Sequence, residues 1–401
     1  MTSPALQRPL VAFLGACALL ASAAGAAEPG VTDTQIVLGS VTPVSGPPSL
    51  LGKAHVAGLR VWQQDVNGRG GINGRKVEIR LDDDGYVPQR ALLGVKRLNE
   101  SENVFGLVGT SGSAALLAML PYIEEQKIPT VNALAVAASH FTPPRKTVFV
   151  VGPTYCQEVN AAITYMVKSR NLQGGKFALV YQDDEFGADV RCGFQKAVKA
   201  LKLASVSEVM FKRGTKDFSA EMLGLKQAGA TFLLSGGVVA EHSMMMKEAA
   251  KLEMPLTILG IHSAHLGPVQ ALAGPAGDGY FAADYVPPLT DTTVPGMVKF
   301  MALARKHLSD DELKSLNRYS ITAYVGALLM EDAIRRCGKA LTRACVVDQL
   351  ERTKGFATDG LASPITFSPT SRHSPSSVLV LRSDAKGAKF DRVSDPIPIE
   401  D

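Results

Sequence analysis

The stretch Phe177-Ala-Leu-Val-Tyr181 decides the fold class. An uninterrupted apolar run of this length is typical of a parallel strand that is covered by helices on both faces. Amphipathic segments lie between such runs, and in one of them Val159, Ala162, Ile163 and Val167 repeat at the spacing of a helix. This alternation predicts an α/β protein with doubly wound parallel sheets.

The alternation occurs twice along the 401 residues of the chain. One series runs to about Val150, and a second begins after Pro153 and ends near Gly260. A chain of this length favours two or three domains, so we expect two lobes, each with its own sheet. The expected strands are Gln35–Thr42, Lys76–Asp82, Val104–Gly109, Thr130–Asn132, Lys176–Tyr181, Ser205–Met210, Thr231–Ser235 and Leu256–Gly260.

Three connections are expected to cross between the lobes. All three contain proline: Val151-Gly-Pro-Thr154, Tyr285-Val-Pro-Pro288, and a third expected near Ser363-Pro364. Helices near Val294–Leu308, Asn317–Cys337 and Thr342–Thr353 would pack on the first lobe, and a strand Ser377–Leu381 on the second. The predicted boundaries are residues 28–152 and 286–362 for the first lobe and residues 153–285 and 363–401 for the second. Ligands of open α/β sheets bind at the carboxyl ends of the strands, so we expect the site between the lobes.

The N-terminal segment has the pattern of a secretory signal. Arg8 precedes the apolar run Leu10–Leu20, and small residues follow up to Ala27. Residues 1–27 are therefore predicted to be a signal peptide, because eleven apolar residues are too short to span ~30 Å of hydrocarbon. Lipoprotein processing at Cys17 is the alternative. Either way we expect an exported protein, which in a Gram-negative cell is periplasmic.

Export makes disulfides the favoured state of the four remaining cysteines. Cys337 and Cys345 flank a short loop between two helical patterns, which favours that bridge and leaves Cys156 to pair with Cys192. Four separate buried thiols are the alternative. The sequence contains no Cys-x-x-Cys pair that would indicate a zinc site or a redox motif.

Several functional classes lack their signatures in this chain. Net charge is 42 − 38 = +4 without basic clusters, which argues against a nucleic-acid partner. The sequence has no G-x-S-x-G elbow, H-E-x-x-H motif or P-loop, so we expect neither an enzyme nor a cofactor. His262 and His265 have a spacing that suits a metal, but no Asp, Glu or Cys stands near them in sequence. Asp82-Asp83-Asp84-Gly85 is contiguous, unlike an EF-hand loop, and is interpreted as a strand end and turn.

The turn Gly109-Thr-Ser-Gly-Ser113 is a candidate anion site. It follows an expected strand and opens a helix, so backbone N–H groups and the Ser113 hydroxyl would face a bound carboxylate. A dinucleotide fingerprint would require G-x-G-x-x-G and an acidic residue at the end of the next strand. Neither is present. A purely structural strand-to-helix turn is the remaining alternative.

A set of ordered motifs resembles the leucine/isoleucine/valine-binding family of periplasmic solute-binding proteins. The motifs at the beginning of the chain are Gly30–Gly39, Pro43–Pro47, Asn67–Lys76 and Asp83–Pro88. Those of the second half are Asp183–Gly187, Arg213–Phe218 and Leu234–Gly237. The resemblance covers essentially the whole chain after the signal segment. It implies the two-lobe type I fold, a small-molecule ligand and a separate ABC permease complex as partner.

The resemblance also implies ligand-binding positions. They are Gly112 and Ser113 at the carboxylate corner, Ala135 and Val136 beside it, Tyr86 and Tyr155, and Phe186, Val238 and His262 of the second lobe. Two of them depart from the family pattern, because Val136 stands where a Thr is frequent and His262 where an acidic residue usually receives an ammonium group. With Tyr86 near the carboxylate corner, the chain resembles the branch of the family that binds aromatic acids more than the amino-acid branch.

The favoured function is a monomeric receptor that captures a small carboxylate without an α-ammonium group and presents it to an ABC importer. Binding of a branched-chain amino acid or amide is an alternative, in which Glu241 or Asp284 would take over the ammonium. A ligand-sensing subunit with the same fold is a second alternative. A secreted enzyme on a doubly wound fold is a third, because fold alone does not fix function.

Overall fold

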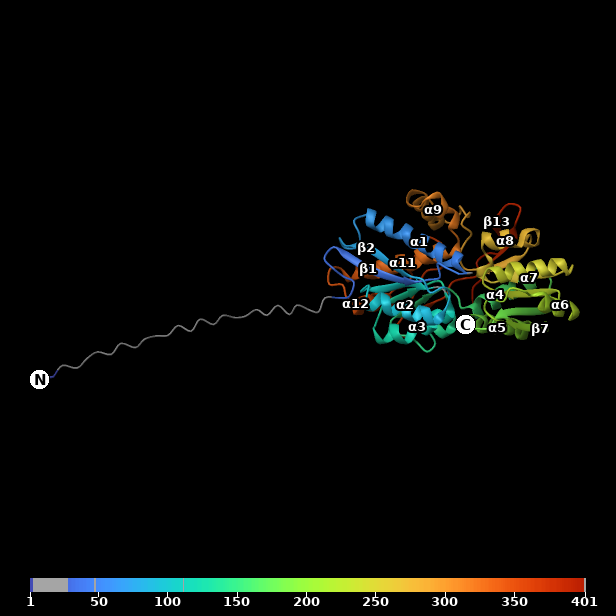
Figure 1. The fold of residues 1–401 in the computed structure, drawn as a ribbon, viewed down its shortest axis with the longest axis horizontal. Helices are drawn as coiled ribbons and strands as arrows, with labels where there is room; N and C mark the ends of the chain where they lie inside the picture. Colours follow the sequence, from blue (N-terminus) through green and yellow to red (C-terminus); the bar gives the residue numbers. More distant parts are fainter. Residues whose placement is uncertain (3–27, 47, 111, 400–401) are drawn as a thin grey trace.

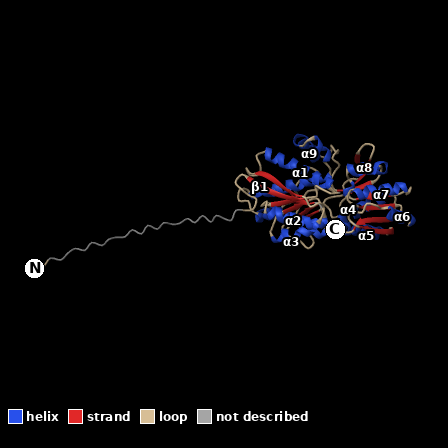
Figure 2. Ribbon diagram, viewed as in Figure 1, coloured by secondary structure: helices blue, strands red, loops and turns tan. Residues whose placement is uncertain are grey.

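The computed structural model describes residues 1–2, 28–46, 48–110 and 112–399. The expected signal peptide, including Cys17, lies outside the described residues, apart from Met1 and Thr2. The described chain forms two lobes side by side (Figure 1). Each lobe has a central sheet with helices packed around it (Figure 2). No helix in the described part of the chain combines the length and the apolar character needed to cross a membrane.

The first lobe is built on a sheet of six parallel strands in the order β11-β5-β4-β3-β1-β2. Its strands are β1 (Gln35–Val41), β2 (Lys76–Asp82), β3 (Gly106–Thr110), β4 (Thr130–Asn132), β5 (Val148–Val151) and β11 (His373–Ser374). Its helices are α1 (Ser49–Gly68), α2 (Pro88–Glu100), α3 (Ser113–Glu125), α9 (Pro295–His307), α10 (Asp310–Ser315), α11 (Arg318–Cys337) and α12 (Arg343–Glu351), with a 3-10 turn at Ala138–His140. Helix α1 packs on α11 and α2 packs on α3. The α9–α12 segment therefore returns to the first lobe, as expected.

The second lobe has a sheet of seven strands in the order β13-β12-β10-β9-β8-β6-β7. Its strands are β6 (Lys176–Gln182), β7 (Ala204–Phe211), β8 (Phe232–Gly236), β9 (Thr257–Gly260), β10 (Phe281–Asp284), β12 (Leu379–Asp384) and β13 (Lys389–Arg392). Its helices are α4 (Tyr155–Ser169), α5 (Glu185–Leu201), α6 (Ser219–Gln227), α7 (Ala240–Lys251) and α8 (Gly267–Ala273), with 3-10 turns at His262–Ala264 and Gly274–Gly277. Strand β12 pairs antiparallel with both β10 and β13. The second sheet is thus parallel except at this edge, where the C-terminal tail adds an antiparallel hairpin.

The chain crosses between the lobes three times. It leaves the first sheet after β5, returns after β10, and crosses again between β11 and β12. The third crossing was expected near Ser363, but His373 and Ser374 still pair with Val150 and Val151 of the first sheet. Residues 363–374 therefore belong to the first lobe. The two-residue strand β11 is too short to leave a periodic signal in the sequence.

Both predicted disulfides are present. Cys156 on α4 is bonded to Cys192 on α5, with an S–S distance of 2.11 Å. Cys337 at the end of α11 is bonded to Cys345 on α12, at 2.10 Å. Each bridge joins two neighbouring helices of one lobe.

The central strands of the two sheets follow the same order, and this order indicates where a ligand would bind. In each lobe the first strand lies between the second and the third, as in β2-β1-β3 and β7-β6-β8. Loops on either side of such a switch point diverge and leave a crevice at the carboxyl ends of the strands. The loops of both lobes at the carboxyl ends of the strands therefore carry the candidate ligand contacts.

Candidate functional site

A small cavity of about 30 Å³ lies between the lobes at these loops, and we call it the inner cavity. Six predicted site residues line it: Tyr86, Gly112, Tyr155, Phe186, Val238 and His262. They come from both lobes, so the fold brings together positions far apart in the sequence. Five further residues complete the lining: Leu51, Leu134, Ile261, Ser263 and Tyr319.

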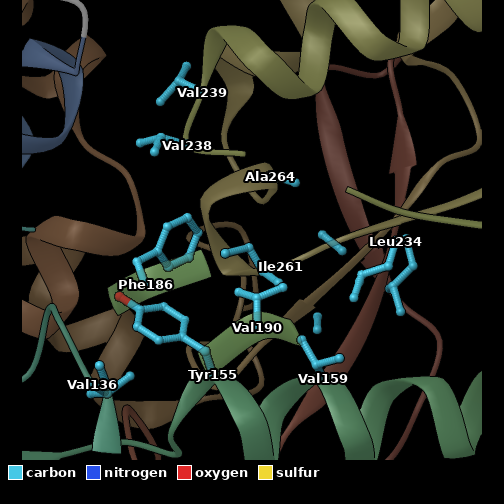
Figure 3. Packing of buried hydrophobic residues seen from close by; sticks show 14 of the residues in the cluster. Val136, Tyr155, Val159, Phe186, Val190, Leu234, Val238, Val239, Ile261 and Ala264 are labelled. Atoms are coloured by element: carbon cyan, nitrogen blue, oxygen red, sulfur yellow. The ribbon is translucent and has the colours of Figure 1, made fainter. Parts of the chain in front are cut away.

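The other three predicted residues lie behind this lining. Ser113 is buried, and its hydroxyl lies 3.4 Å from that of Tyr155. Ala135 uses its carbonyl to accept a hydrogen bond of 2.6 Å from Asn132. Val136 is fully buried in the hydrophobic core and lies beyond Tyr155 in Figure 3. Ser113 therefore contacts the inner cavity indirectly, through the hydroxyl of Tyr155, which lines it.

The turn before α3 is shaped by Gly112 and Tyr86. Gly112 is the N-cap of α3 and has a φ of 88°, in the region that favours glycine. A Cβ at Gly112 would lie 2.8 Å from the Tyr86 ring. Only glycine therefore allows the aromatic ring to lie against the N-terminus of α3.

Aromatic rings surround His262. The ring of Tyr155 stacks on His262 with centroids 5.2 Å apart, and Phe186 meets Tyr155 edge-on at 4.8 Å. Figure 3 shows Tyr155 and Phe186 beside each other, with Val238 above them. Tyr319, at the start of α11 in the first lobe, approaches His262 edge-on at 6.3 Å. Aromatic rings therefore make up much of the lining of the inner cavity. Its polar side-chain groups are the imidazole of His262 and the hydroxyl groups of the tyrosines and Ser263.

Glu158, which was not among the residues predicted from the sequence, holds His262 in place. Its carboxylate accepts hydrogen bonds from the backbone N–H of His262 at 2.8 Å and from the Nδ1 atom at 2.6 Å. Both side chains are almost completely buried. Because Glu158 engages Nδ1, the Nε2 atom is the ring nitrogen left for a ligand. The sequence does contain an indication of this role, because Glu158 is an acidic residue on the apolar face of α4, three residues after Tyr155 and four before Ala162.

Asp284 is committed to a different cluster at the second crossing. It forms a buried ion pair of 2.8 Å with Arg318 and accepts a hydrogen bond of 2.6 Å from His265. Burial opposes ionisation of Asp284, but the charge of Arg318 and the bonds from His265 and Arg318 outweigh it and lower the pKa. Asp284 is therefore not available to neutralise a ligand ammonium.

His262 and His265 each have a carboxylate partner that is distant in sequence. The sequence near them contains no acidic residue, but the fold supplies one carboxylate to each, Glu158 and Asp284. Each histidine is thus an individual hydrogen-bond partner. Within the described residues, no group of three His, Cys, Asp or Glu side chains is arranged to hold a metal ion.

A second cavity of about 130 Å³ adjoins the first, and we call it the outer cavity. Tyr86 and Val238 line both cavities. The outer cavity is also lined by Glu241, whose carboxylate accepts from the backbone N–H groups of Val238 and Val239 at 3.2 Å each. Among the described residues, Arg213 of the second lobe is the only arginine that lines the outer cavity. Among the described residues, charged side chains therefore line the outer cavity but not the inner one.

Buried His242 supports the wall of the inner cavity. Its Nε2 atom bonds the hydroxyl of Ser263 at 2.9 Å, and its Nδ1 atom bonds that of Ser235 at 2.6 Å. Burial, with a smaller contribution from His262, lowers the pKa of His242 to about 3. This side chain is therefore neutral at physiological pH.

Comparisons with known proteins agree with this geometry. Residues 35–388 match the family model described as periplasmic binding protein, so the chain belongs to this family and is a binding protein, not an enzyme. A Leu/Ile/Val-binding protein homolog 7 from Brucella suis is 26% identical over 344 residues, which cover 82% of this chain and 83% of that protein.

Solved structures share the type I periplasmic binding fold. A fatty acid ABC transporter substrate-binding protein from Thermomonospora curvata is 25% identical, with a TM-score of 0.79 over 93% of this chain and 97% of that one. A solute-binding protein from Rhodopseudomonas palustris in complex with p-hydroxybenzoic acid is 22% identical, with a TM-score of 0.80 over 91% and 98%. These proteins are named for different ligands, so the ligand class is argued from the site itself.

Proposed function

We propose that this protein is the periplasmic receptor of an ABC importer and captures a small carboxylate that lacks an α-ammonium group. Its ligand would have an apolar, aromatic body. Membership of the periplasmic binding protein family supports the receptor role. The membrane permease that receives the ligand would be a separate complex.

One observation carries the ligand class. Within the described part of the chain, no Asp, Glu, Lys or Arg side chain lines the inner cavity. Burying an ammonium group without a carboxylate partner is very unfavourable. Glu158, which lies behind His262, already uses its oxygens on that residue. An α-amino acid would therefore leave its positive charge unpaired when the lobes close on it.

The same lining suits an aromatic acid. The rings of Tyr155 and Phe186 offer faces and edges for a second ring, and His262 Nε2 offers a polar contact. Backbone N–H groups at the N-terminus of α3 would receive the carboxylate, as the sequence predicts for Gly112 and Ser113. The ligand would then span the cavity from the first lobe to the second.

Binding of an amino acid is the second candidate, and Glu241 favours it. This carboxylate lines the outer cavity, so an ammonium group that pointed outward would find an acid there. The two candidates differ in the end of the ligand that faces the outer cavity.

A thermal-shift panel tests the proposed function. Protein purified without denaturation would be screened with benzoate, 4-hydroxybenzoate, phenylacetate, leucine, phenylalanine and their amides, and native mass spectrometry would detect any ligand that co-purifies. We expect the aromatic acids to raise Tm and the amino acids to leave it unchanged, with Glu248→Ala on the surface of α7 as a matched control that behaves like the wild type. A shift with leucine and none with any aromatic acid would support the Glu241 alternative instead.

A further inference from the structure

Among the described residues, Tyr86 and Val238 line both cavities between the lobes, and Tyr86 is the aromatic one. The inner cavity has a volume of about 30 Å³ and the outer cavity one of about 130 Å³. Each is smaller than the roughly 300–1,000 Å³ typical of ligand pockets. A side chain that separates the two cavities would therefore limit the length of the ligand that the cleft accepts.

The backbone of Tyr86 is held in an uncommon conformation. Its φ is 66°, in the left-handed region that bulky residues rarely adopt. Its N–H donates to Asp84 Oδ1 at 2.7 Å, and its carbonyl accepts from Arg213. Strained residues persist where several contacts determine them, and they are concentrated at functional sites.

The side chain of Tyr86 is clamped from both lobes. Arg213 of the second lobe places its guanidinium 4.2 Å from the centre of the Tyr86 ring. An ion pair of 2.6 Å with Asp184, the N-cap of α5, fixes Arg213 in turn. In the first lobe, Gly112 leaves room for the ring against α3. Residues of both lobes therefore position Tyr86.

The walls of the outer cavity indicate what would enter it. Beyond Arg213 and Glu241 its lining includes the apolar side chains of Pro48, Val87 and Val239. An apolar chain would be buried there, and each buried methylene would strengthen binding about fourfold.

We infer that Tyr86, clamped by Arg213, is the residue that sets ligand length in this receptor. With the ring in place, the site takes a compact aromatic carboxylate. Without it, the two cavities join and accept an aryl-alkanoic acid whose chain runs into the outer cavity. This inference rests on the proposed function, because it uses carboxylates as ligands.

A methylene series tests the inference. Calorimetry would measure the affinity for benzoate, phenylacetate, 3-phenylpropionate and 4-phenylbutyrate in the wild type and in Tyr86→Gly, which fits the positive φ without strain. In the wild type, affinity falls or stays level as the chain lengthens. In Tyr86→Gly, affinity relative to benzoate rises about fourfold with each added methylene.

Two further variants make the result specific. Arg213→Ala removes the clamp but leaves the ring, so it shifts the preference in the same direction by a smaller factor. Tyr181→Ala is the matched control, because Arg191 lies over the Tyr181 ring at 6.0 Å on a part of the second lobe that lines neither cavity. This control keeps the order of preference of the wild type.

Each outcome has one meaning. If the wild type binds the acids but neither Tyr86→Gly nor Arg213→Ala changes the order of preference, the inference is wrong while the proposed function stands. If Tyr86→Gly does not fold, Arg213→Ala alone decides the matter. If the wild type binds none of the four acids, the proposed ligand class is wrong and the inference falls with it.

Discussion

Replacing Glu158 by alanine tests whether this buried acid positions His262 for the ligand. The substitution removes two hydrogen bonds, of 2.8 and 2.6 Å, from a site where both side chains are almost completely buried. Hydrogen bonds to charged groups contribute about 1.5–3 kcal/mol each, so Glu158→Ala is expected to cost about 3–6 kcal/mol of the free energy of unfolding. That is a large part of the roughly 5–15 kcal/mol of a typical domain.

Glu158→Gln separates the structural role from the binding role. The amide keeps an oxygen for the backbone N–H of His262 and a polar group beside Nδ1, so we expect about half of the stability loss. It does not keep the carboxylate that orients the imidazole, and we expect affinity for an aromatic acid to fall about tenfold, or ~1.4 kcal/mol.

Chemical denaturation and isothermal calorimetry would measure the two quantities in the same preparations. Glu248→Ala removes an acid that forms an exposed pair with Lys251 and serves as the control, with an expected change below about 1 kcal/mol. The reasoning is refuted if Glu158→Ala unfolds at the denaturant concentration of the wild type and binds ligand with unchanged affinity.

Three further predictions follow from the site and its supports. Ser113→Ala should weaken carboxylate binding by about 0.5–1.5 kcal/mol, the range of a hydrogen bond between neutral groups, because its hydroxyl lies 3.4 Å from that of Tyr155 behind the cavity lining; calorimetry would measure this, and an unaltered affinity would remove Ser113 from the site. Replacing both Cys156 and Cys192 by serine should lower stability by about 4 kcal/mol for a bridge that spans 36 residues; denaturation curves equal to those of the wild type would contradict this. Burial lowers the pKa of His242 to about 3, whereas an unfolded histidine titrates near 6.5. As pH falls, the unfolded state therefore takes up a proton at His242 that the folded state does not. This lowers the free energy of unfolding by about 2 kcal/mol from pH 7.5 to pH 5. Denaturation curves of His242→Gln at the two pH values should lack that part of the pH dependence.

The sequence predicted the two-lobe α/β architecture because most of the fold is carried by local periodic signals, but it did not predict the four-residue strands β5 and β10. Continuous apolar runs such as Phe177–Tyr181 predict buried parallel strands, and both series of strands and helices are present. The two-residue strand β11 is held by pairing with β5, which is distant in sequence, and the four-residue strand β13 by a local hairpin with β12. Such short segments have no periodicity of their own, which is why the third crossing was placed about ten residues too early.

The site could be predicted only as far as the loops at the strand ends. Tyr86, Phe186, Val238 and His262 follow strands or open helices at the crevice, so topology brings them together. The contact between Arg213 and Tyr86 joins residues 127 positions apart across the two lobes, and no local pattern announces it. Glu158 was visible as an acid on an apolar stripe, but its partner is 104 residues away, so its role could be assigned only from the structure.

Isothermal calorimetry with benzoate and leucine, on one preparation of the wild type, is the most direct test of the central claim. The inner cavity offers aromatic rings and an imidazole whose carboxylate partner is already engaged. We therefore predict saturable binding of benzoate and no measurable heat with leucine. Tight binding of leucine with none of benzoate would show that an acid in the cleft accepts the ammonium group, and would contradict the account.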